Sequence, residues 1–85
     1  MTFQYDDSAD VLWVSVSEPK DLCVYVESQT PGVVLKVEES SGIIRAFEVL
    51  SWKRRIAVGP ILIEEITDPE FQAQWLKNAP LGQQY

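Results

Sequence analysis

The fold is decided by residues 11–50, which read VLWVSVSEPKDLCVYVESQTPGVVLKVEESSGIIRAFEVL. Four stretches within this segment alternate side chains with a period of two and are rich in β-branched and aromatic residues, as strands are. Pro19, the Pro31-Gly32 pair and Gly42 stand between the stretches, where such residues favour tight turns. The segment therefore predicts an antiparallel meander with strands at 11–17, 22–27, 33–38 and 43–50, the first two joined as a hairpin.

Shorter elements are expected on both sides of this segment. A short strand precedes the turn at residues 6–10, a helical turn is expected at 51–56, and an edge strand at 58–66. Residues 81–85 are expected to form a loose tail. The predicted fold class is α+β: an antiparallel β-meander of about five to six strands with one C-terminal α-helix packed on it, forming a single domain over residues 1–85.

The C-terminal helix has a start signal and an apolar stripe. Thr67 and Glu70 have the spacing of a capping box, and the helix is expected to run to about Asn78. Phe71 and Trp75 stand four residues apart, so that both lie on one helix face. We expect the helix to dock on the sheet by this stripe, with Trp75 as its core anchor.

The composition narrows the classes of function. Thirteen acidic and seven basic residues give a net charge of -6, which repels nucleic-acid backbones and anionic membranes and favours a basic protein partner. Cys23 is the only cysteine and histidine is absent, so neither an intramolecular disulfide nor a cysteine- or histidine-built metal site can form. A cytoplasmic protein without a cofactor, and without a membrane-spanning segment, is expected.

Apolar side chains are expected on both faces of the sheet, which is the strongest functional signal in the sequence. A lone helix covers only part of a second apolar face, and an exposed remainder would favour association with a protein partner or with a second copy. We therefore predict a non-enzymatic protein-binding module, as a homodimer or small homo-oligomer, with Trp13, Tyr25 and Trp52 as aromatic anchors. We expect the second face to hold Val11, Trp13, Cys23, Tyr25, Val34 and Ile44.

Two other readings use the charged residues. Asp6, Asp10 and Glu48 could supply oxygen ligands to a divalent cation, in a metal-binding protein or metal-dependent enzyme. Against this, aspartates commonly cap their own turns, and a strand glutamate is commonly solvated or paired with a residue such as Arg45 or Lys36. No catalytic triad is available without histidine.

The third reading is weak nucleic-acid binding through the one basic cluster. Residues 53–55 are Lys-Arg-Arg and stand beside Trp52, and basic residues interleaved with an aromatic ring can hold phosphate or stack on a base. Three charges set against a net charge of -6 favour a solvated turn instead. We rank this reading last.

Three short motifs resemble a widespread bacterial family, the domain-of-unknown-function family 2283, over about residues 4–56. They are Tyr5-Asp6-Asp7-Ser8-Ala9-Asp10-Val11-Leu12-Trp13-Val14, Gly32-Val33-Val34-Leu35 and Ala46-Phe47-Glu48-Val49-Leu50-Ser51. The resemblance implies a small β-meander protein with no assigned activity and an antitoxin-like or partner-binding role. The family has an apolar residue before a Gly-Ile-Glu motif; here Arg45 stands at the apolar position and Ala46 at the glycine. Residues 57–85, with the strand and helix expected within 57–80, lie outside the resemblance.

Overall fold

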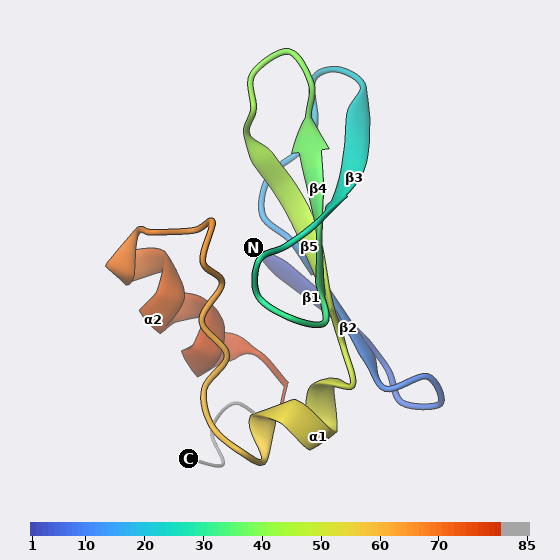
Figure 1. Ribbon diagram of the computed structural model, residues 1–85, viewed down its shortest axis with the longest axis vertical. Coiled ribbons are helices and arrows are strands. Elements are labelled where there is room, and N and C mark those ends of the chain that lie inside the picture. Colours follow the sequence, from blue (N-terminus) through green and yellow to red (C-terminus); the bar gives the residue numbers. More distant parts are fainter. Residues whose placement is uncertain (81–85) are drawn as a thin grey trace.

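The computed structural model describes residues 1–80. Its centre is a five-stranded sheet with antiparallel neighbours in the order β1-β2-β5-β4-β3, followed in the chain by two helices (Figure 1). This confirms the predicted α+β class; the tail expected at 81–85 lies outside the described residues. The elements are β1 (Thr2–Asp6), β2 (Val11–Ser15), β3 (Cys23–Glu27), β4 (Val33–Glu38), β5 (Ile44–Leu50), α1 (Trp52–Ile56) and α2 (Pro69–Asn78).

The prediction of a hairpin between the strands at 11–17 and 22–27 is wrong. β2 pairs with β1 and β5, whereas β3 pairs with β4 at the far edge of the sheet. Residues 16–22 connect them and cross the end of the sheet instead of making a tight turn. Val16 N and Ser17 N both donate to Arg45 O, at 2.8 and 3.2 Å, so this connection begins by extending the pairing with β5.

One face of the sheet carries the hydrophobic core. Alternate side chains of the three inner strands, β2, β5 and β4, point to this face, and both helices lie on this side of the sheet (Figure 1). The helix stripe docks as expected: the Trp75 and Phe71 rings lie 5.5 and 6.2 Å from the Phe47 ring, centroid to centroid. The core consists of Leu12, Val14, Val33, Leu35, Phe47, Val49, Trp52, Ile56, Ile61, Ile63, Trp75 and Ala79.

A β-bulge changes the alternation at the start of β5. The register between β4 and β5 shifts between Lys36 and Val37, so that Val37 lies opposite Ile44. An extra residue in one strand reverses which face the following side chains occupy. Ile44 therefore packs against the core cluster, and our placement of this residue on the second face was wrong.

The edge strand expected at residues 58–66 is also wrong, because this segment forms no strand. Ile61 and Ile63 are both buried, while the backbone on either side of Ile63 bonds to the Thr30 side chain in the β3–β4 turn. Thr30 Oγ1 donates to Leu62 O at 3.2 Å and accepts from Glu64 N at 3.0 Å. These contacts satisfy backbone groups that strand pairing would otherwise have used.

The start of α2 differs from the predicted capping box by one residue. Asp68, not Thr67, is the N-cap, and its carboxylate accepts from Glu70 N at 3.0 Å. Pro69 occupies the first turn, where its missing N–H has no intrahelical partner to lose. The helix ends at Asn78, as expected.

Gly32 in the β3–β4 turn adopts a φ of +77°, and a Cβ there would collide with the Arg55 guanidinium. We expect Gly32→Ala to destabilise the protein by more than the 1–2 kcal/mol or so that a left-handed alanine costs, because Arg55 must also move. Gly42→Ala is the matched control: its φ is +73° but a Cβ meets nothing within 4 Å. Urea denaturation curves measure the difference; equal costs would show that the Arg55 contact contributes nothing.

Candidate functional site

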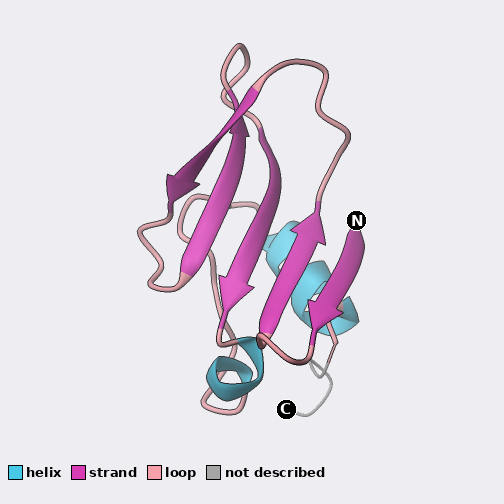
Figure 2. Cartoon of the chain, turned by 90° about the vertical axis from the view of Figure 1, so that its right-hand side faces the viewer, coloured by secondary structure: helices cyan, strands magenta, loops and turns pink. Residues whose placement is uncertain are grey.

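Among residues 1–80 nothing covers the second face of the sheet, since both helices and the segment joining them lie on the core side (Figures 1 and 2). Its two aromatic residues are well exposed: Trp13 keeps 40% and Tyr25 keeps 70% of its surface. The helix therefore does not cover the second face. By strand alternation and register, this open face includes Thr2, Gln4, Asp6, Val11, Trp13, Ser15, Cys23, Tyr25, Glu27, Val34, Lys36, Ala46, Glu48 and Leu50.

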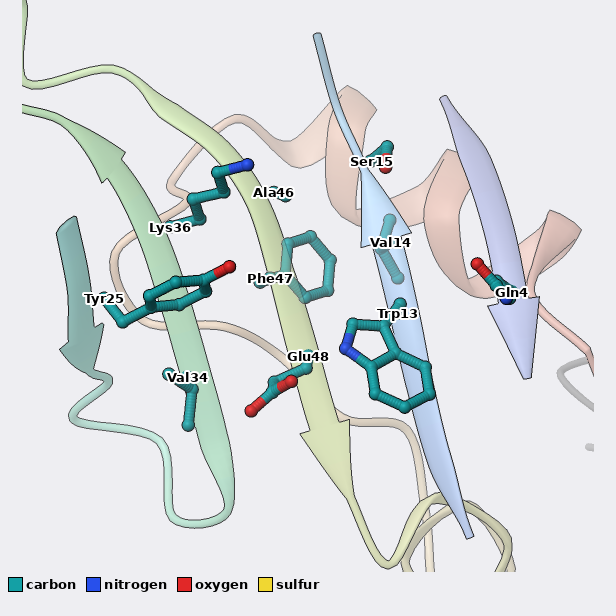
Figure 3. A pocket seen from close by; sticks show the side chains of 10 residues that line it. All are labelled: Gln4, Trp13, Val14, Ser15, Tyr25, Val34, Lys36, Ala46, Phe47 and Glu48. Carbon is teal, nitrogen blue, oxygen red and sulfur yellow. The ribbon is translucent and has the colours of Figure 1, made fainter. Parts of the chain in front are cut away.

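A shallow hollow of about 310 Å³ lies at the centre of the open face. Ser15 and Ala46 are register partners on neighbouring strands, and their small side chains leave space above the sheet. Trp13 on β2 and Tyr25 on β3 rise on either side of this space, with the Tyr25 ring lying over β4 (Figure 3). The hollow is thus a gap between two aromatic walls with a floor of small side chains.

Two residues of opposite charge line the hollow. Lys36 lies opposite Ala46, and Glu48 lies opposite Trp13 and Val34. Both are half-buried, and within residues 1–80 the one ion pair joins two other residues, so Lys36 and Glu48 are not paired with each other. Each therefore presents its charge to whatever occupies the hollow.

A buried ion pair closes one end of the sheet. The Arg45 guanidinium contacts both Glu38 carboxylate oxygens, with Nε–Oε2 and Nη2–Oε1 distances of 3.2 Å, and Nη1 donates to Ser17 Oγ at 2.8 Å. The Glu38 carboxylate also accepts from Lys20 N and Ser41 Oγ, both at 2.7 Å. These bonds, the one from Arg45 foremost, lower the pKa of Glu38 from 4.5 to about 2. Arg45 is thus committed to this pair and does not neutralise the hollow.

The structure does not gather the acidic residues proposed as a cation site. Asp6 Oδ1 accepts from Ser8 N, Ser8 Oγ and Ala9 N at 3.0, 2.7 and 3.3 Å, so this carboxylate closes its own turn. Glu48 instead stands on the open face. Among residues 1–80, no group of three or more acidic or cysteine side chains lies close enough to hold a metal ion.

Asp10 has a different structural task, which explains the spacing of the Tyr5-to-Asp10 motif. Its Oδ1 accepts from Tyr5 Oη at 2.7 Å and from Lys53 N at 2.8 Å, and its backbone oxygen accepts from Trp52 N at 3.0 Å. Ser51 is the N-cap of α1 but gives it no side-chain bond, so Asp10 caps this helix from across the chain. The backbone bonds and the Tyr5 hydroxyl lower the pKa of Asp10.

The bond to Asp10, followed by burial and nearby acidic charges, raises the pKa of Tyr5 to about 12. We expect Asp10→Gly to bring this pKa back toward 10, since the hydrogen bond to Asp10 is its largest cause. The variant should also lower the melting temperature by several degrees, because α1 loses its cap. Glycine suits this position because Asp10 has a φ of +54°. Ultraviolet titration of phenolate absorbance measures the pKa. Asp21→Gly, at an exposed residue, is the control; a Tyr5 titration unchanged in Asp10→Gly would contradict the assignment.

Trp52 is not a surface anchor, so that prediction was wrong. It is fully buried, and its Nε1 donates to Pro80 O at 2.8 Å. The short α1 turns this ring into the core while leaving Lys53 and Arg54 exposed. The basic cluster therefore lacks an adjacent exposed ring for base stacking.

Sequence reasoning found the two aromatic walls, Trp13 and Tyr25, but not the hollow between them. The signal it missed is the small Ala46 in the middle of a strand of larger residues. Only the register shows that Ser15 and Lys36 flank this alanine. The hollow at the centre of the sheet could therefore be predicted only once the strand order was known.

We compared the chain with family models, curated proteins and solved structures. No family model matches it, and neither a curated protein nor a solved structure does. The resemblance to family 2283 thus stays a prediction. Within residues 1–80, no helix is long and apolar enough to cross a membrane.

Proposed function

We propose that this chain is a non-enzymatic protein-binding module that docks a partner protein on the open face. The observation that carries the proposal is the hollow between Trp13 and Tyr25, because aromatic side chains around a desolvated centre concentrate binding energy at protein interfaces. The hollow of about 310 Å³ is at the lower end of the range for small-molecule pockets. Its size and shallow form suit one or two side chains of a partner.

Charge defines the chemistry of that partner. The chain carries a net charge of -6, and Glu48 stands in the hollow with no ion pair among residues 1–80. A partner that places an apolar side chain between the aromatic walls and a basic side chain beside Glu48 would match both features. We therefore propose a basic protein surface with an apolar centre, which the overall field of the chain would also attract.

The test compares matched variants against one identified partner. The protein captured by the wild-type chain is purified, and its binding is measured by calorimetry. We expect Trp13→Ala and Glu48→Lys each to weaken binding about tenfold or more. Val58→Ala, at a residue 90% exposed and away from the open face, should leave binding unchanged. Failure to obtain a directly binding basic partner, or binding that survives both open-face variants, would overturn the proposal.

A further inference from the structure

Within residues 1–80, no element covers the β3 edge of the sheet. Among these residues β3 pairs only with β4, and it lies on the side of the sheet far from α2 (Figure 1). Val24 and Val26 point toward the core side but beyond the cover of the helices, and remain 37 and 45% exposed. Edge strands are usually blunted by proline, lysine, a bulge or a covering element. The β3 sequence, CVYVE, contains neither proline nor lysine, and its pairing with β4 shows no bulge.

The backbone of β3 is oriented so that a further strand can pair with it. Glu39 N donates to Leu22 O and Ser28 N to Val33 O, so these two pairs are hydrogen-bonded pairs of the β3–β4 ladder. Bonded and non-bonded pairs alternate along an antiparallel ladder. Cys23, Tyr25 and Glu27 fall at the non-bonded positions. Their N–H and C=O groups consequently point outward, away from β4.

We infer that β3 pairs antiparallel with β3 of a second copy, with the two Tyr25 residues directly opposite each other. In this register Cys23 faces the partner's Glu27, and the outward backbone groups of both strands meet as bonded pairs. Val24 faces the partner's Val26 on the core side, which covers the exposed valines. No two like charges lie opposite one another, so the edge is complementary to itself.

This pairing is preferred over pairing through the other edge. β1 presents Thr2, Gln4 and Asp6 on its open side, and its inward Phe3 and Tyr5 already pack against the core. Joining two β1 strands would therefore bury little further apolar surface. Joining two β3 strands also extends the open faces of both copies into one surface, and it does not depend on the partner docking proposed above.

A charge-pair experiment tests the register at its centre. We expect the wild-type chain to sediment as a dimer, and Tyr25→Lys or Tyr25→Glu alone to weaken dimerisation about tenfold or more, because like charges then face each other. An equimolar mixture of the two variants should recover a mixed dimer. Circular dichroism checks that both variants fold. A wild-type monomer at millimolar concentration, or a mixture that stays monomeric, would overturn the inference.

A cross-linking experiment tests the same register at its flanks. In a bonded antiparallel pair the Cα atoms lie about 5.5 Å apart, within the range for a disulfide. Under oxidation, Glu27→Cys should link to the partner's Cys23 and give a covalent dimer on a non-reducing gel. Within one chain the two thiols are about 13 Å apart along the strand, too far to join. Val26→Cys, which faces the other side, is the control; equal cross-linking of both variants would contradict the register. Trp13→Ala should leave the dimer intact.

Discussion

Replacing Arg45 with methionine is expected to lower the melting temperature by roughly 10–20 °C, one of the two largest effects in the molecule. Arg45 and Glu38 keep only 10 and 4% of their side-chain surface. Without the guanidinium, the Glu38 carboxylate stays buried with only Lys20 N and Ser41 Oγ as donors. Thermal unfolding followed by circular dichroism measures the loss.

The double variant Arg45→Met with Glu38→Leu separates the pair's own contribution from the cost of breaking it. Replacing both members of a buried ion pair by apolar groups is often close to neutral, because no charge is left uncompensated. We therefore expect the double variant to regain most of the lost stability. Lys53→Met, at an exposed residue, is the control and should change little. A double variant as unstable as Arg45→Met would show that shape, not charge, is what Arg45 supplies.

The same pair gives an acid-side signature. The pKa of Glu38 is about 2 in the folded protein, against 4.5 as its ordinary value. Its ionised form therefore stabilises the fold fully above pH 4.5, and this contribution is lost as the pH falls toward 2. In Arg45→Met the main cause of the lowered pKa is gone, so the unfolding free energy should fall less between pH 4.5 and pH 2 than it does in the wild-type chain. Urea denaturation at several pH values in this range measures the difference.

Local patterns predicted the strands and the C-terminal helix because their causes are local. Alternation fixed which residues of β2 and β4 face the core, and the Pro31-Gly32 turn was recognisable because Gly32 needs a positive φ, observed at 77°. Phe71 and Trp75 were placed correctly because helical spacing alone puts them on one stripe. In each case the sequence neighbours supply the determining interaction.

The failures occurred where distant residues decide. β2 pairs with β5 rather than with β3, and this pairing joins residues distant in the chain, which no local pattern specifies. The bulge beside Lys36 reversed the side of Ile44, and no turn residue announced it. Trp52 went to the core because Asp10, far away in the chain, caps its helix. The candidate site was therefore half predicted: its aromatic walls, but not its floor or its charges.

Trp75→Ala is expected to cost about 3–5 kcal/mol of unfolding free energy, a large share of the roughly 5–15 kcal/mol that stabilises small domains. Trp75 is fully buried, with its ring centroid 5.5 Å from that of Phe47 and 5.6 Å from that of Trp52. Removing it opens a cavity between α2, the sheet and α1 at once. Urea denaturation followed by circular dichroism measures the cost.

Trp75→Ala removes a hydrogen bond of the indole N–H as well as the volume of the ring. Trp75 Nε1 donates to Gln72 Oε1 at 2.9 Å, which orients the Gln72 amide so that Nε2 donates to Ile63 O and Ile66 O at 2.9 and 2.6 Å. The segment before α2 is thus tied to the helix through Trp75. Trp75→Phe keeps much of the ring but not the donor, so it should cost less than alanine and still loosen this segment, seen as faster amide exchange at Ile66. Leu62→Ala, at a residue 58% exposed, should change the stability by less than about 0.5 kcal/mol. If Trp75→Ala cost no more than this control, α2 could not pack on the sheet through its aromatic stripe.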